Sequence, residues 1–174
     1  MQTTHQPSPL RYLTIAALFA AMITVSILVF RVPVGPGIVH FGDALIYLAA
    51  CFLPRRYALV AVSIGGVMAN VLTGMFIWAP ATAIIKPLIA IWFINRGQIL
   101  TKWHMAALVI GGLVNTVLYS SYASFFIHGN WYAHLPFATS DMLIQSGGSA
   151  VIFVMLAVIL DRIKLKKHLG LEYA

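Results

Sequence analysis

The stretch that decides the fold is GDALIYLAACFLPRRYALVAV, residues 42–62. An aspartate opens an apolar run, and Pro54-Arg55-Arg56 separates this run from a second one. Proline stops a helix, and two adjacent arginines are too costly to bury in hydrocarbon. The stretch therefore predicts two membrane helices, a short one over Gly42–Leu53 and a second over Tyr57–Thr73.

The composition of the whole chain agrees with a membrane protein. Of 174 residues, 61% are hydrophobic and 9% are charged, and the mean hydropathy is +0.92. Soluble domains carry about 25% charged residues. The net charge of +7 comes from basic residues between apolar segments, so it indicates membrane topology and not nucleic-acid binding.

Further apolar stretches flank the opening one, several of them near the roughly 20 residues that cross a bilayer as a helix. They cover about Leu10–Phe30, Pro80–Ile94, His104–Ile127 and Ala138–Leu160. The first is longer than the apolar part of a secretory signal peptide and has no small-residue cleavage site, so we retain it as a helix. The sequence predicts an all-α integral membrane protein, with six transmembrane helices in one domain over residues 1–174.

The basic residues predict the orientation, because Lys and Arg are retained on the cytoplasmic side. Placing the N-terminus inside puts nine of the eleven in cytoplasmic segments: Arg11, Arg55, Arg56, Arg96, Lys102, Arg162, Lys164, Lys166 and Lys167. We therefore expect both termini to be cytoplasmic in a multi-pass protein of the prokaryotic cell membrane.

Polar side chains concentrate in the outer halves of the predicted helices. Asp43, the only acidic residue among the first 140, and Lys86 fall at the same predicted depth. Charges at this depth must face protein or a wet cavity, so we expect the two residues to satisfy one another or a ligand. The alternative is a purely structural ion pair that fixes helix packing.

The convergence of polar groups from five helices favours a binding cavity that opens outward. An apolar and aromatic site with a few directed polar groups suits a small planar polar molecule. An aromatic belt at the outer interface is the alternative explanation for the tyrosines and tryptophans, including Trp131 and Tyr132. The predicted substrate-binding residues are His40, Asp43, Tyr47, Asn70, Trp78, Lys86, Asn115, Tyr119, Tyr122 and Gln145.

The first helix carries small residues four apart, a pattern that lets another helix approach closely. Ala16 and Ala20 form one such pair, and Ala17 and Ala21 form another on the adjoining face. This surface packs inside the chain or contacts a partner protein. We predict that all four alanines belong to a partner-docking surface.

Motifs of enzymatic chemistry are absent from the sequence. It has no GxxxxGK[ST] loop for ATP hydrolysis, no HExxH and no GxSxG. The single cysteine, Cys51, excludes an internal disulfide, and the six histidines lack the short spacing of a metal site. We expect no catalytic residue, no bound metal and no cofactor.

Three segments resemble the substrate-binding S components of energy-coupling factor (ECF) vitamin transporters: VHFGDALIYLAA (39–50), IGGVMANVLTG (64–74) and WAPATAIIK (78–86). The resemblance is to the group that includes hydroxymethylpyrimidine, pyridoxine and riboflavin-like S components. It implies six helices, an extracellular-side site and a first-helix alanine motif that meets a transmembrane coupling subunit. It also implies two ATPase subunits. These partners would hydrolyse ATP, for which this chain has no GxxxxGK[ST] loop.

The leading hypothesis is thus an S component of an ECF-type ABC importer for a small water-soluble vitamin. Hydroxymethylpyrimidine or pyridoxine is favoured, since both are small rings, and riboflavin is an alternative. A second hypothesis is a stand-alone ion- or proton-coupled carrier that uses Asp43 and Lys86 as a relay. A third is a membrane scaffold without ligand.

Overall fold

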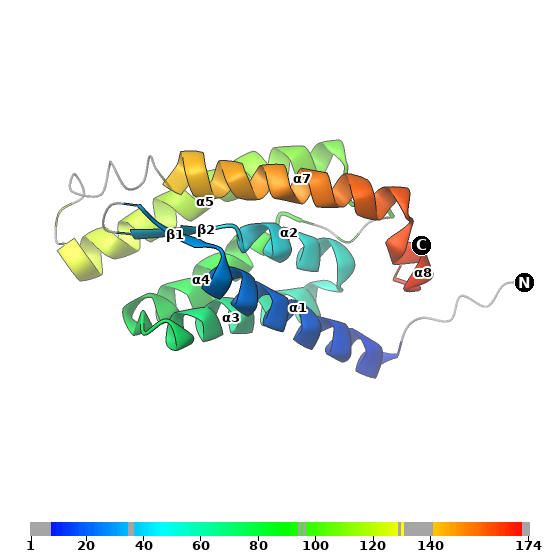
Figure 1. Cartoon of the computed structure of the whole chain (residues 1–174), viewed down its shortest axis with the longest axis horizontal. Coiled ribbons are helices and arrows are strands. Elements are labelled where there is room, and N and C mark those ends of the chain that lie inside the picture. The colour runs from blue at the N-terminus through cyan, green and yellow to red at the C-terminus, as the bar shows by residue number, and fades with distance from the viewer. Residues whose placement is uncertain are drawn as a thin grey trace, which may run out of the picture.

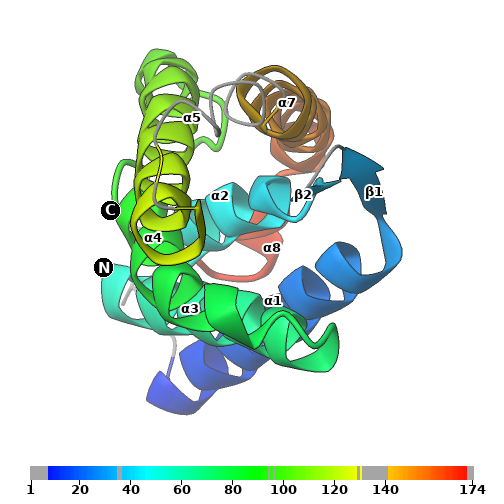
Figure 2. The same cartoon turned by 90° about the vertical axis from the view of Figure 1, so that its left-hand side faces the viewer.

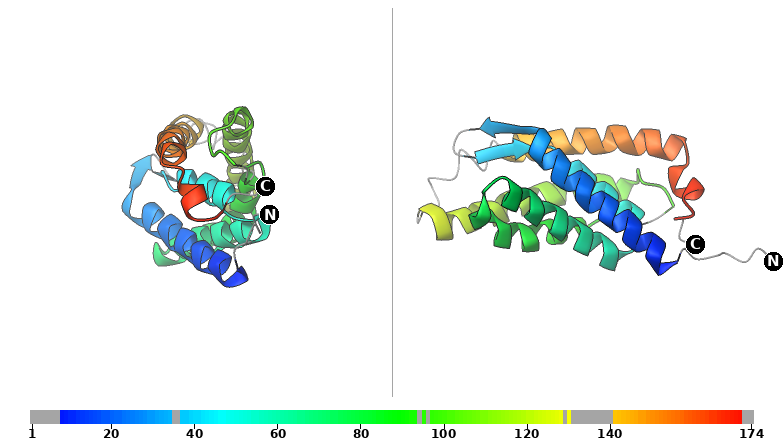
Figure 3. Two further views of the ribbon diagram at one scale, coloured as in Figure 1. Left: turned by 90° about the vertical axis from the view of Figure 1, so that its right-hand side faces the viewer. Right: turned by 60° about the horizontal axis from the view of Figure 1, so that its bottom comes forward.

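The protein is a bundle of helices that run broadly along one long axis (Figure 1). The computed structural model describes residues 8–34, 37–93, 95, 97–128, 130 and 141–171. The start of helix α1 and the last helix, α8, lie at the same end of the bundle (Figure 1). A small β-hairpin lies at the opposite end (Figure 3, right).

The elements follow one another in a simple order. The helices are α1 (Pro9–Val29), α2 (Asp43–Phe52), α3 (Arg55–Leu72), α4 (Ala79–Ala90), α5 (Lys102–Ala123), α7 (Gly147–Arg162) and α8 (Leu165–His168). Strands β1 (Arg31–Val34) and β2 (Gly37–His40) pair antiparallel, with Val32 opposite Val39. Short helical turns complete the order: the 3₁₀ turn η1 (Phe76–Trp78) and the π-helical segments η2 (Ser124–His128) and η4 (Asp141–Ser146).

The expected helices are present, with three differences. The hairpin and α8 were not expected, and α4 ends at Ala90 instead of about Ile94. The expected start of the sixth helix near Ala138 lies outside the described residues. Three helical segments are long and apolar enough to cross a membrane, namely Pro9–Val29, Lys102–Phe126 and Ile144–Arg162. The count of six spans and the orientation therefore stay predictions.

The short helix α2 lies in the middle of the bundle. Seen from the hairpin end, α1, α3, α4, α5 and α7 surround it (Figure 2). All of its residues except Leu45 are buried. An apolar segment that is covered by other helices does not need the length of a lipid-exposed span, so α2 positions Asp43 inside the protein.

Helix α4 contains a proline near its end. Pro87 has no N–H to donate to the carbonyl of Ala83, the residue four positions earlier. The Ser63 hydroxyl of α3 donates a hydrogen bond to this freed carbonyl at 3.1 Å. The bond satisfies a backbone group that is costly to leave unpaired in a membrane, and the helix ends one turn later.

Close packing of α1 against α3 depends on glycine. A Cβ at Gly65 would lie 2.8 Å from the Ala20 carbonyl oxygen and 2.9 Å from the Ile23 Cβ. The Thr24 hydroxyl lies 2.9 Å from the Ala20 carbonyl oxygen of its own helix and 3.0 Å from the Gly65 carbonyl oxygen of α3, so it can donate to either. Small residues on both helices therefore let the two backbones touch.

This packing divides the predicted docking surface. Ala16 and Ala20 are buried inside the chain, whereas Ala17 and Ala21 are exposed. Internal helix packing covers the side of α1 that carries Ala16 and Ala20, so the structure does not favour these two alanines as partner contacts. Ala17 and Ala21 remain a predicted partner contact.

Polar contacts and α8 lie at the end of the bundle where α1 begins (Figure 1). Asp161 of α7 accepts two backbone hydrogen bonds. The Ile99 N–H donates to its Oδ1 at 2.8 Å, and the Leu100 N–H donates to its Oδ2 at 2.8 Å. Helix α8 lies across the space between the larger helices (Figure 3, left), and Leu171 behind it is buried. The Asp161 bonds hold the segment that precedes α5 against the end of α7.

Replacing Gly65 with alanine tests the α1–α3 contact. We expect the Gly65→Ala protein to lose about 1–3 kcal/mol of unfolding free energy, because the added methyl overlaps α1 backbone. Gly97→Ala is the control, since a Cβ there meets nothing within 4 Å, and it should change stability by less than about 0.5 kcal/mol. Unfolding of both variants in detergent measures the difference, and equal effects would contradict the packing account.

Candidate functional site

The centre of the candidate site is a buried ion pair. The Lys86 Nζ of α4 lies 2.7 Å from the Asp43 Oδ1 of α2. The exposed fractions are 2% for Lys86 and 0% for Asp43. Asp43 is the first residue of α2, where the partial positive charge of the helix N-terminus also favours a carboxylate. The structure confirms that the two predicted charges meet.

Neutral polar side chains from two other segments form hydrogen bonds with the two charged groups. The Asn115 Oδ1 of α5 accepts a hydrogen bond from Lys86 at 3.1 Å. The Gln145 Nε2 of η4 donates to the second carboxylate oxygen of Asp43 at 3.1 Å, and the His40 backbone N–H donates to the Gln145 Oε1 at 3.4 Å. Five elements therefore converge on one pair of charges.

These contacts are needed because burial of charge is expensive. Removing a carboxylate and an ammonium from water costs several kcal/mol for each group, which their attraction offsets only when the remaining polar positions are also satisfied. Asn115 and Gln145 supply these additional bonds. The result is an electrically neutral, hydrogen-bonded centre inside the bundle.

A second polar chain joins the pair through Tyr119 of α5. The Lys86 Nζ lies 5.0 Å from the centre of the Tyr119 ring, a cation–π distance. The Tyr119 hydroxyl lies 2.9 Å from the Thr82 hydroxyl of α4, which accepts a hydrogen bond from the Asn70 Nδ2 of α3 at 2.7 Å. Asn70 is thus connected to the charged centre by Thr82 and Tyr119.

Thr82 is the linking residue that the predicted site omitted. It lies one helical turn before Lys86, so both side chains point to the same face of α4. Gly66 of α3 makes room for it, because a Cβ at Gly66 would lie 2.6 Å from the Thr82 Cγ2. The signal that identifies Thr82 in the sequence is its spacing of four from the buried lysine.

Aromatic side chains adjoin this second chain. The Trp78 ring centre lies 6.0 Å from that of Tyr119 and 5.9 Å from that of Tyr122. The Tyr122 hydroxyl donates to the Ile77 carbonyl at 2.6 Å, which holds α5 against the η1 turn. All three aromatic residues are partly exposed. They provide an aromatic surface that leads from the charged centre to the edge of the protein.

His40 borders the pair from β2, outside the helices. Burial lowers the pKa of the His40 imidazole to about 4, and the nearby Asp43 carboxylate only partly opposes this effect. The ring is therefore neutral at physiological pH. Its Nδ1 atom is buried and has no hydrogen-bond partner in the described structure.

Tyr47 lies apart from the polar centre. It is one turn further along α2 than Asp43, stacked on Phe93 at 4.5 Å and edge-on to Phe153 at 5.8 Å. Its ring belongs to an aromatic core towards the other end of the bundle. Of the ten predicted binding residues, Tyr47 is the one whose position gives the least support to ligand contact.

Other sequence expectations lie outside the described part of the chain. Trp131, Tyr132 and His134 fall in 131–140, and the side chains of His128 and Asp141 are likewise not described. Among the described residues there is no cluster of three or more His, Cys, Asp or Glu side chains that would hold a metal.

The role of Thr82 is tested by an isosteric change. Thr82→Val removes the hydroxyl that links Asn70 with Tyr119, so we expect a loss of about 1–3 kcal/mol of unfolding free energy, because both of these part-buried hydrogen bonds are lost. The control is Thr14→Val, because the exposed Thr14 hydroxyl bonds only within its own helix, to the Leu10 carbonyl. If the two valine variants unfold alike, the polar chain contributes nothing to stability.

One family of known proteins matches most of the chain. A family model described as the S component of an ECF-type riboflavin transporter matches residues 9–162. No curated protein matches the chain. The matched range contains the whole polar network and nearly all of the helical bundle. This chain therefore belongs to the family of ECF-type riboflavin transporter S components, the substrate-binding subunits of membrane vitamin importers.

Proposed function

We propose that the protein captures a small water-soluble vitamin or vitamin precursor at the hairpin end of the bundle and delivers it into the cell. The observation that carries this proposal is the convergence of Asp43, Lys86, Asn115 and Gln145 from four different segments on one buried point. Packing alone does not require the opposite charges, the amides and the adjacent aromatic rings to gather at one level.

The chemistry of the network favours a planar ring with polar substituents. Ammonium and amide groups offer donors, carboxylate and amide oxygens offer acceptors, and Trp78, Tyr119 and Tyr122 offer aromatic faces for stacking. We favour hydroxymethylpyrimidine and pyridoxine, because both are small rings that suit a compact site. Riboflavin is the third candidate, since the description of the matching family names a riboflavin transporter.

The proposed topology follows the distribution of charge. The described cations, apart from Arg31 and Lys86, lie at the end that carries α8: Arg11, Arg55, Arg56, Lys102, Arg162, Lys164, Lys166 and Lys167. This asymmetry supports six spans with both termini in the cytoplasm. The polar network then faces the extracellular half of the membrane, where an importer must meet its substrate.

The proposed partners are a transmembrane coupling subunit and two ATPase subunits, which supply the energy of transport. The exposed Ala17 and Ala21 of α1 provide a surface of small side chains for close helix contact inside the bilayer.

Identification of the bound molecule is the most direct test of this function. The purified protein should release a heteroaromatic vitamin or precursor on denaturation, detected by mass spectrometry. Calorimetric titration of ligand-free protein with hydroxymethylpyrimidine, pyridoxine and riboflavin should then show tight binding of one of them. The proposed substrate class would be contradicted if no compound co-purified and if none of the three compounds bound to the protein.

Transport without ATPases separates an S component from a self-sufficient carrier. Vesicles that contain this protein alone should bind the vitamin but should not accumulate it. Accumulation driven by a proton or sodium gradient in such vesicles would contradict the importer proposal and favour a carrier that uses the Asp43–Lys86 pair as a relay.

Bulky side chains on α1 test the docking surface. Ala17→Trp combined with Ala21→Trp should abolish co-purification with the coupling subunit and leave vitamin affinity unchanged. Met22→Trp is the control, because Met22 is also exposed but lies about 140° around the helix from Ala17 and about 100° from Ala21. Unchanged assembly in the double variant would remove this surface from the proposal.

A further inference from the structure

A cavity lies far from the polar network, at the basic end of the bundle. It has a volume of about 370 Å³ and is lined by the end of α2, the start of α3, the end of α4 and the segment that follows α4. Its lining is largely apolar, with Leu53, Leu59, Ile91 and Phe93 as the larger side chains. The early end of α4 at Ala90 leaves this space between the helices.

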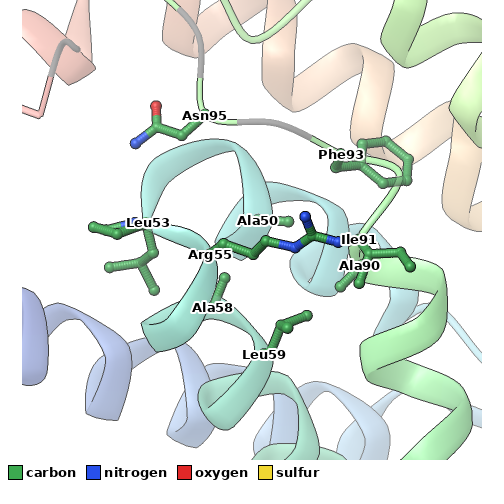
Figure 4. A pocket seen from close by; sticks show the side chains of 10 residues that line it. Ala50, Leu53, Arg55, Ala58, Leu59, Ala90, Ile91, Phe93 and Asn95 are labelled. Carbon is green, nitrogen blue, oxygen red and sulfur yellow. The ribbon is translucent and has the colours of Figure 1, made fainter.

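Arg55 is the charged residue of this cavity. Its side chain reaches from the start of α3 across the opening toward Ile91 and Ala90 (Figure 4). In the part of the chain that the structure describes, its guanidinium has no hydrogen bond or ion pair, whereas the neighbouring Arg56 contacts the ring and hydroxyl of Tyr57. Helix α3 also begins here without a side-chain cap, so its partial positive charge adds to that of Arg55.

We propose that this cavity binds an anionic membrane phospholipid, with the phosphate at Arg55 and the start of an acyl chain in the apolar cleft. An unpaired guanidinium at the mouth of an apolar cavity matches a molecule that combines a phosphate with a hydrocarbon chain. Basic pockets between transmembrane helices are known to bind lipid head groups. The cavity lies within the size range of about 300–1,000 Å³ that is typical of ligand sites.

The surrounding charge favours an anionic lipid over a zwitterionic one. Arg56 follows Arg55 in the chain, and the same end of the bundle carries Arg11, Lys102 and the basic residues of α8. Each basic group near a membrane surface adds about 1 kcal/mol to the attraction of anionic lipid. The proposal requires only a membrane-embedded chain and does not depend on which vitamin the other site binds.

The test compares two adjacent arginines. Delipidated wild-type protein, Arg55→Gln and Arg56→Gln are incubated with phosphatidylglycerol or phosphatidylcholine in detergent, and bound lipid is counted by native mass spectrometry. We expect one phosphatidylglycerol to bind wild type and Arg56→Gln in preference to phosphatidylcholine. Arg55→Gln should bind it about fivefold more weakly. An equal loss in the two variants would overturn the site and indicate general surface charge.

A filled cavity and a soluble competitor complete the experiment. Ile91→Trp should exclude the acyl chain and reduce lipid binding while Arg55 is retained, and unchanged binding in this variant would contradict the proposal. Glycerol 3-phosphate should not displace the lipid; displacement would assign the site to a soluble phosphate compound. Unfolding temperature and vitamin binding are measured on every variant, so that loss of the lipid is separated from misfolding and from failure of the vitamin site.

Discussion

The fold depends on one constraint, the need to satisfy a carboxylate and an ammonium that are both withdrawn from water. Asp43 and Lys86 lie on different helices and are joined at 2.7 Å inside an apolar bundle. Their remaining polar positions determine where α5 and η4 must lie, because Asn115 and Gln145 have to reach them. Movement of any of these segments would leave a buried charge incompletely paired, which is strongly unfavourable.

The same constraint relates the short α2 helix to function. Because the surrounding helices cover it (Figure 2), α2 carries its aspartate into the protein interior and not to the lipid. The hairpin leads the chain into that helix, and its last residue, His40, contacts Gln145 through its backbone. Bundle architecture and the proposed binding chemistry therefore use the same contacts, and the opposite end carries the basic residues and the cavity beside Arg55.

Sequence reasoning reached the helical bundle and the charged pair, because apolar length and matching depth are properties of single segments. It did not reach features that depend on how segments meet. The hairpin has strands of four residues with a proline inside, too short for an alternation signal. The spacing of Ala16 and Ala20 predicts a close helix contact but not which helix makes it, and α3 turned out to be that helix. Thr82 is linked to Asn70 and Tyr119, which belong to two other helices, and the sequence of α4 alone does not place these partners beside it.

The central claim is that the Asp43–Lys86 pair organises ligand binding and not only helix packing. Calorimetric affinity for the identified vitamin, measured on folded Asp43→Asn, Lys86→Gln and the combined variant, tests this claim most directly. The account predicts that each single variant loses at least about tenfold in affinity, since each leaves a buried charge without its partner beside the ligand, and that the combined variant does not restore binding. Wild-type affinity in the folded single variants would contradict it and reduce the pair to a structural ion pair.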